Sequence, residues 1–325
     1  MPDLTRFDLV LAFDCQDGNP NGDPDAGNMP RVDPETLHGL VSDVCQKRKI
    51  RDRVYLSQRE PDGTLKPGYD IFFGHSGIPD RRVLNDQIET AHHSRMADPA
   101  IQAEMAAIKK DGDKKHRAAA LTRAELCATR FDIRTFGAVL STGDFSAGQV
   151  RGPVQCTFAR SIDPILTLEA AITRKSVTTA KDAEDQMKRD GEITGTMGRK
   201  NLIPYGLYVS HWFVSPALAK QTGFSWTDFH VLCQSLLMMF EDDRSASRGT
   251  MTTRKLIAFQ HESPLGNERA AVLFDRVRFT RNDPAKPARA WSDYTSQVER
   301  TDPESKIKTW DLSNPEELSA LFKGT

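Results

Sequence analysis

Apolar and polar positions alternate in several short segments of the chain, which is typical of β-strands that bury one face. Residues 7–13 alternate phenylalanine and leucine with aspartate, valine and alanine, and 205–213 alternate in a similar way. Shorter segments of the same kind predict further strands at 131–140, 153–159, 256–259 and 272–279. Residues 162–176 are also expected to be extended.

Apolar residues at helical spacing predict helices between these strands. Asp33 followed by Pro34 has the pattern of an N-cap and first turn, so a helix is expected over 33–50. Ser225 is expected to cap a second helix with a wide apolar face. Further helical patterns occur at about 81–97 and 99–110, and 109–117 is expected to form a charged turn.

The order of these elements predicts an α+β fold. The elements follow one another as strand, helix, two strands, a later strand, helix and strand. This is the order found in ferredoxin-like and RNA-recognition-motif folds. Two long segments interrupt this order, an insertion at 54–130 and an excursion at 160–203. Residues 181–200 contain few large apolar side chains, so we expect them to protrude from the core.

Composition limits the function. The chain has 44 lysines and arginines against 45 aspartates and glutamates, a net charge of −1, which excludes a uniformly basic nucleic-acid binder but allows one basic face. No apolar run is long enough for a membrane span, and the N-terminus does not resemble a secretory signal, so a cytoplasmic location is expected. Five scattered cysteines without a C-x-x-C pair predict neither a zinc site nor a disulfide framework.

Common motifs of enzymes and cofactor binding do not occur in the sequence. It contains no P-loop, no G-x-G-x-x-G, no H-E-x-x-H and no G-x-S-x-G. We therefore expect no cofactor, although a metal-free ribonuclease that uses histidine and lysine would carry no such motif.

The loop 17–28 resembles a calcium-binding loop, because oxygen-bearing residues alternate and Gly22 stands at the sixth position. The twelfth position is Asn28, where the calcium loop has a bidentate glutamate, and a strand rather than a helix precedes the loop. The alternative is an ordinary loop of Asx turns.

Basic residues gather at 47–53, where five cations occur within seven residues. One or two cations would be enough to favour the C-terminal end of a helix, so this density indicates phosphate binding instead. Residues 134–141 partly match the RNA-recognition strand motif, but Ala138 and Ser141 replace two of its aromatic residues. Met197 beside Arg199 could wedge against a base while the cation holds a phosphate, or it could simply fill the core.

Five segments together resemble the CRISPR Cascade backbone subunit of type I-C systems. They begin at Asn19, Arg31, Lys47, Asp132 and Arg151 and read NPNGDP, RVDP, KRKIRD, DIRTFGAV and RGPVQ. The resemblance is ordered and covers about residues 5–280.

The resemblance implies an RNA-recognition-motif-like (ferredoxin-like) palm with a helical finger insertion and a β-hairpin thumb. The implied segments are palm 1–53, fingers 54–130, palm strands 131–165, thumb 166–203, and palm completion with the C-terminal segment 204–325. It also implies a non-catalytic subunit that stacks head to tail along a CRISPR RNA guide. The implied partners are the guide, target DNA paired to it, neighbouring copies and other Cascade subunits.

Matched motifs and positions give the expected RNA-binding residues. From the loops, the helix and the strands these are Asn21, Arg31, Lys47, Lys49, Arg51, Arg134, Gln149 and Arg151. From the thumb, placed by position, they are Lys175, Ser176, Met197 and Arg199.

The sequence leaves two alternatives open. Type III relatives of the family cleave RNA with an acidic residue in the loop after the first strand, and the acids of this loop are Asp17, Asp23, Asp25 and Asp33. A metal-dependent ribonuclease of the same architecture is therefore one alternative. A calcium-binding structural protein built on 17–28 is the other.

Overall fold

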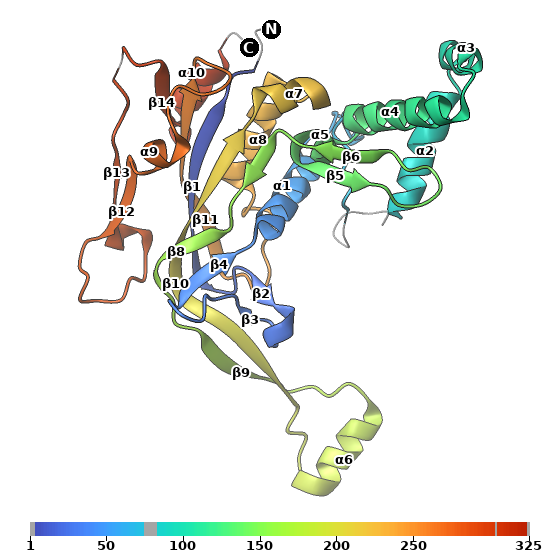
Figure 1. Cartoon of the computed structure of the whole chain (residues 1–325). Helices are drawn as coiled ribbons and strands as arrows, with labels where there is room; N and C mark the ends of the chain where they lie inside the picture. The colour runs from blue at the N-terminus through green and yellow to red at the C-terminus, as the bar shows by residue number, and fades with distance from the viewer. Residues whose placement is uncertain (1–3, 75–82, 303, 324–325) are drawn as a thin grey trace.

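The computed structural model describes residues 4–74, 83–302 and 304–323 and is built around one antiparallel sheet (Figure 1). Its strands follow the order β14-β11-β1-β10-β8-β4, and β7 and β9 also pair with β10. The bounds are β1 Phe7–Gly18, β4 His38–Val41, β7 Val154–Cys156, β8 Ala159–Pro164, β9 Leu168–Arg174, β10 Thr196–Val214, β11 Thr250–His261 and β14 Ile307–Asp311. The fold is therefore mixed α and β with a central antiparallel sheet, as the element order predicts.

Strand β1 lies in the middle of this sheet. Phe7 pairs with Val214 of β10 on one side and with Gln260 of β11 on the other. Because side chains alternate along a strand, Phe7 faces one hydrophobic cluster and Val10 faces a second cluster on the opposite side of the sheet. The strand predicted at 7–13 is confirmed, and it is buried on both faces.

Two helices, α1 (Asp43–Ser57) and α8 (Trp226–Met238), pack on the face of the sheet that Phe7 joins. Ser225 caps α8 as predicted, because its hydroxyl accepts the N–H of Asp228 while the Asp228 carboxylate accepts the N–H of Ser225. Short helix α7 (Pro216–Thr222) leads from β10 into α8.

The helix expected over 33–50 begins later than predicted, with Ser42 as its N-cap. Asp33 Oδ1 accepts two backbone N–H groups of the residues after Pro34, which closes a turn instead of opening a helix. Leu37 then adopts φ 58°, and β4 follows in extended conformation beside β8. An aspartate before a proline fits a turn as well as a helix start, which explains the error.

The segment predicted as an insertion contains helices α2 (Leu84–Met96), α3 (Pro99–Ala107) and α4 (Asp111–Thr129). The turn predicted at 109–117 is wrong from residue 111 onward, since two aspartates in the first turn of α4 favour a helix N-terminus. Residues 81 and 82, the start of the first predicted helix, lie outside the described residues.

The strand predicted at 131–140 is a helix in its first half. Short helix α5 (Phe131–Phe136) ends at Gly137, whose φ of 83° glycine adopts readily, and β5 (Gly137–Leu140) follows. Asp132 stabilises the start of α5, because its carboxylate accepts the backbone N–H groups of Phe72 and Phe73. β5 pairs with β6 (Gly148–Arg151), and this hairpin packs with α2 and α4 around a third hydrophobic cluster.

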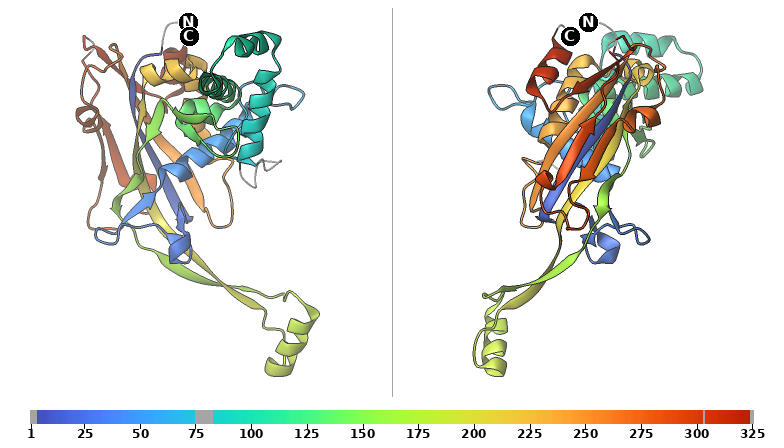
Figure 2. Two further views of the ribbon diagram at one scale, coloured as in Figure 1. Left: turned by 45° about the vertical axis from the view of Figure 1, so that its right-hand side comes forward. Right: turned by 90° about the vertical axis from the view of Figure 1, so that its left-hand side faces the viewer.

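Strands β9 and β10 continue beyond the sheet as a two-stranded hairpin that carries α6 (Ala180–Asp190) at its tip (Figure 2). Arg174 pairs with Thr196 at the outer end of this hairpin. Thr179 and Asp182 form a capping box at the start of α6. The protrusion predicted at 181–200 is confirmed, and we call β9, α6 and the paired part of β10 the thumb.

The C-terminal part covers the second face of the sheet with α9 (Ala270–Phe274), β12 (Val277–Arg281) and β13 (Tyr294–Val298). The strand predicted at 272–279 is therefore helical at its start, where α9 buries Leu273 against this face. The remaining elements are β2 Gly22–Asp23, η1 Pro24–Ala26, β3 Met29–Pro30, η2 Trp291–Asp293 and α10 Pro315–Phe322. Among the described residues, no helix is both long and apolar enough to cross a membrane.

Candidate nucleic-acid interface

The basic cluster 47–53 lies within α1, and its cations point in different directions around the helix. Lys49 is fully buried and contacts the carboxylate of Asp243, and its ammonium lies 5.6 Å from the centre of the Phe240 ring. Arg51 is 9 % exposed and donates from Nε to Asp132 Oδ2 over 2.9 Å. Both side chains therefore contact carboxylates inside the protein, although the sequence assigned them to phosphate.

Burial changes the acidity of Lys49. Desolvation of its ammonium lowers the pKa from 10.5 to about 7, since a charged group is disfavoured away from water. Arg48 and Arg248 also pair with Asp243, at 3.1 and 3.4 Å. Asp243 therefore keeps partners when Lys49 loses its proton.

Two outward cations of α1, Arg48 and Arg53, anchor the loop after α8. Arg48 binds Asp243, and Arg53 Nη1 lies 2.7 Å from the carboxylate of Asp242. Lys47 pairs with Asp43 at 3.0 Å and also donates to Gln155 Oε1 over 3.4 Å. The side chain of Lys47 is 12 % exposed, so it reaches the surface at the end of β7.

Arg134 is buried at the junction of α4, α5 and α8. Its Nη2 and Nε donate to the two carboxylate oxygens of Asp228 over 2.8 and 3.1 Å. Its Nη1 donates to the carbonyl oxygens of Gly68 and Cys127. This guanidinium is satisfied inside the chain, and Asp228, its carboxylate partner, was not singled out in the sequence.

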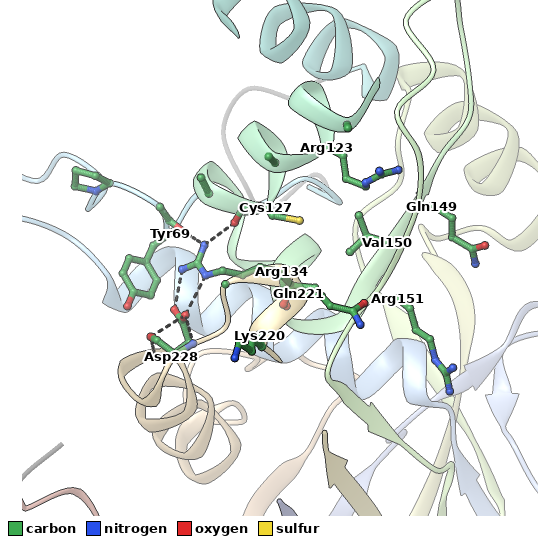
Figure 3. Close-up of a pocket in the computed structure, with 18 residues that line it drawn as sticks. Tyr69, Arg123, Cys127, Arg134, Gln149, Val150, Arg151, Lys220, Gln221 and Asp228 are labelled. Carbon is green, nitrogen blue, oxygen red and sulfur yellow. Dashed lines mark hydrogen bonds and ion pairs between the residues drawn. The ribbon is translucent and has the colours of Figure 1, made fainter. Parts of the chain in front are cut away.

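Gln149 and Arg151 are exposed on β6, where alternation along the strand places both on one side. They line a pocket of about 810 Å³ together with Arg134, which forms part of its floor (Figure 3). The structure therefore brings together three expected RNA-binding residues from two adjacent segments.

Asn21 and Arg31 lie in the loop between β1 and β4. Asn21 Oδ1 accepts the N–H and the hydroxyl of Ser42, which ties this loop to the N-terminus of α1. Arg31 lies 3.3 Å from the carboxylate of Asp23 and keeps a side chain that is 34 % exposed. The backbone N–H of Asp25 donates to Asp23 Oδ1, as in an Asx turn.

The acids proposed for a ribonuclease are spread along the same loop. Asp33 pairs with Arg160 at 2.7 Å, and hydrogen bonding to that arginine lowers the pKa of Asp33 to about 2. Asp17 is exposed, with φ 51°, at the end of β1. Within 4–74, 83–302 and 304–323, no three His, Cys, Asp or Glu side chains lie close enough to hold a metal ion.

The thumb presents the remaining expected residues to solvent. Met197 is 76 % exposed, so it does not fill a core within the chain. Arg199, two residues on and on the same side of β10, pairs with Glu169 at 2.8 Å and is 78 % exposed. Lys175 and Ser176 are exposed at the end of β9.

The family model described as CRISPR-associated protein Cas7 matches residues 5–299. The chain belongs to the Cas7 family. A curated Cas7 protein of Haloferax volcanii is 46 % identical to this chain over 54 residues, 17 % of this chain and 16 % of the relative. That alignment therefore spans about a sixth of the curated relative.

Two solved structures are similar to this Cas7-family chain at low sequence identity. A chain of a CRISPR RNA-guided surveillance complex in a pre-nicking state is 15 % identical, with a TM-score of 0.47 and 78 % of both chains covered. A chain of another CRISPR RNA-guided surveillance complex is 14 % identical, with a TM-score of 0.42, and covers 78 % of this chain and 69 % of that one.

Sequence reasoning missed cations that only the fold brings to the pocket beside Arg151. Arg123 lies on α4 and Lys220 on α7, about 30 and 70 residues from Arg151 along this Cas7-family chain. No local motif marks either residue. The sequence does contain one weak indication of this pocket. Alanines recur at helical spacing around Arg123, so the helix face beside Arg123 carries only small side chains.

Proposed function

We propose that this chain is a non-catalytic backbone subunit of a type I-C CRISPR surveillance complex. Several copies would stack head to tail along the CRISPR RNA guide and hold its sugar-phosphate backbone without reading its sequence. One observation carries the proposal: a single Cas7 match runs from residue 5 to 299, across the sheet, the helical insertion and the thumb.

The strand order supports an RNA-recognition-motif-like, ferredoxin-like palm. The order β11-β1-β10-β8, with α1 after β1 and α8 after β10, is the order of the split β-α-β arrangement. We assign 1–53, 131–165 and 204–325 to this palm, 54–130 to the fingers and 166–203 to the thumb.

The proposed guide surface consists of the accessible members of the expected set. They follow the loop, α1, β6 and the thumb: Asn21, Arg31, Lys47, Gln149, Arg151, Lys175, Ser176, Met197 and Arg199. We leave out Lys49, Arg51 and Arg134, because buried cations paired to carboxylates cannot reach a phosphate without leaving those partners unpaired.

The guide surface suggests how the protein would act. Cations fix the guide through its phosphates, while Met197 offers an apolar side chain that could displace a base at the thumb. Contacts to the backbone leave base edges free, so that pairing with target DNA reads the sequence. Each copy would add contacts to the same strand, which raises the overall affinity through avidity.

Nuclease footprinting of a CRISPR RNA bound to the purified protein tests this function. We expect regularly spaced accessible positions on an intact RNA, and no cleavage on a parallel gel with Mg²⁺ or Mn²⁺. Regular metal-dependent cuts that disappear in Asp33→Asn or Asp17→Asn would make the protein a ribonuclease of the same architecture. Absence of protection at low salt would contradict guide binding.

Charge reversal at the guide surface gives a second readout. Replacing Arg151 by glutamate should weaken binding by a similar factor for guides of unrelated sequence, because phosphates are common to all of them. Lys308→Glu, an exposed change on β14, is the matched control and should have little effect. A loss confined to some guide sequences would contradict backbone binding.

A further inference from the structure

The pocket between α4, β6 and α7 is built from elements far apart in the sequence. Its walls come from α4, β6, α7 and the start of α8, and its volume is about 810 Å³ (Figure 3). This volume lies in the range of pockets that hold small ligands. We call this cavity the junction pocket.

Small residues line the walls of the junction pocket and leave space inside it. Ala120, Ala124 and Ala128 recur every four residues on the face of α4 that borders the pocket. Gly223, with φ 81°, forms the turn between α7 and α8 on the opposite wall. A ligand can therefore approach the backbone on both sides.

The charge of the junction pocket is strongly unbalanced. Arg123, Arg151 and Lys220 line it, and within the described chain no carboxylate forms an ion pair with any of the three. The acidic residue among the lining residues is Asp228, and both of its oxygens are bound by Arg134. Counting only the residues that the structure describes, the pocket thus keeps three positive charges without an ion-pair partner.

The polar groups around these cations suit an anion with further hydrogen-bonding groups. Gln149 on β6 and Gln221 on α7 add amide groups at the rim. Arg123 already donates to the carbonyl oxygen of Ala147, which fixes its guanidinium at the wall. Tyr69 lies beside Arg134 and adds an aromatic ring. Cations, amides and an aromatic ring, here the half-buried ring of Tyr69, occur together in single-stranded nucleic-acid sites.

We propose that the junction pocket binds phosphodiester groups of a single-stranded nucleic acid, with Arg123, Arg151 and Lys220 as the cations that hold them. The proposal deepens the proposed function, because it adds a contact site at the end of the sheet away from the thumb (Figure 1). The strand has two possible sources, a later part of the guide or a second strand that meets the guide-bound protein.

Lys220 and Ala124 provide the test, since neither belongs to the guide surface. We would measure the fluorescence anisotropy of labelled twelve-nucleotide oligouridylate and oligothymidylate with the full-length protein. A parallel titration would add the oligothymidylate to protein already loaded with a guide. Lys220→Gln removes a cation and Ala124→Trp fills the pocket without changing charge, while Lys308→Gln on β14 is the matched control.

We expect both pocket variants to weaken binding of at least one oligonucleotide about fivefold, as loss of one phosphate contact would. Lys220→Arg should restore it. Loss on oligouridylate would assign the pocket to the guide, and loss on oligothymidylate with guide-loaded protein would assign it to a second strand. Pocket variants that match the control on every oligonucleotide would overturn the proposal.

Two further comparisons distinguish failure of the pocket proposal from failure of the proposed function. Met197→Ala and Arg199→Ala test the guide surface, so a loss in the pocket variants alone would sustain the pocket while contradicting the proposed guide path. A change in self-association without nucleic acid, seen by sedimentation for Lys220→Gln and absent in Lys308→Gln, would instead make the pocket a protein contact and overturn the proposal.

Discussion

Burial and pairing decide what each cation of this chain does. Lys49, Arg51 and Arg134 point into the protein and meet Asp243, Asp132 and Asp228. Arg151 is exposed on β6, and among the described residues it has no ion-pair partner. The sequence pattern could locate the cluster 47–53, but it could not separate inward from outward cations, because their carboxylate partners are up to about 200 residues away.

The Arg134→Ala variant should be less stable than the wild-type protein. The substitution leaves Asp228 buried without its cation, which costs about 3–5 kcal/mol of unfolding free energy. Urea denaturation measures the loss, and Arg151→Ala on exposed β6 is the matched control, expected within about 0.5 kcal/mol of the wild type. If the Arg134→Ala variant kept its stability and lost only RNA affinity, the result would support the phosphate contact that the sequence predicted for Arg134.

Lys49 should make stability depend on pH. Its pKa is about 7 in the folded chain and 10.5 ordinarily, so between these values the unfolded chain binds more protons than the folded one. The contribution of Lys49 to the free energy of unfolding therefore rises with pH from about 7 to 10, by at most about 1.4 kcal/mol per pH unit.

Lys49→Met isolates this effect. Urea denaturation of both proteins at pH 7 and pH 9.5 should show the wild type gaining stability relative to Lys49→Met as pH rises. A difference that stays constant across this range would mean that Lys49 keeps its proton beside Asp243.

At the scale of elements, the local pattern was most reliable where it was long. The alternation at 7–13 and 205–213 predicted β1 and β10 because apolar residues recur through both. It failed at 131–136, where apolar spacing in six residues fits a strand or a single helical turn. Asp132 decides in favour of the helix through hydrogen bonds to residues 72 and 73, a contact that the local sequence does not contain.

The tip of the thumb, residues 175–195, should be dispensable for folding. Arg174 and Thr196 are paired across β9 and β10, so an Asn-Gly turn can replace residues 175–195 and close a two-residue hairpin. The replaced segment has no buried residue, and we expect the unfolding midpoint in urea to stay the same. Guide affinity should fall, because Lys175 and Ser176 leave with the segment. A clear loss of stability would show that the thumb packs on the sheet.

At the scale of the whole molecule, the proposed contacts are far apart. From Arg199 to Phe213, β10 rises about 45 Å at roughly 3.3 Å per residue. If one strand bound both the thumb and β6, these two places would therefore contact separate parts of it. A net charge of −1 is compatible with this arrangement, because a chain that is neutral as a whole can still present cations at a few exposed positions.

The salt dependence of guide binding measures how many of these cations meet phosphate. The guide surface has five, namely Arg31, Lys47, Arg151, Lys175 and Arg199, so the slope of log K against log salt should reach at most about 3.5 in magnitude per copy. Binding of a short RNA at several salt concentrations gives this slope. A steeper slope that falls by about 0.7 in Lys220→Gln would place the junction pocket on the guide path.

The central position of β1 also affects how the protein is made. Its two neighbours, β10 and β11, are encoded about 190 and 240 residues after it, so the ribosome emits β1 long before either edge can be paired. At about 5–20 residues per second, a strand with apolar side chains on both faces waits roughly 10–50 s for its partners. The nascent chain is therefore most prone to aggregate during that interval, and slower translation of the segment before β10 should lower the yield of folded protein.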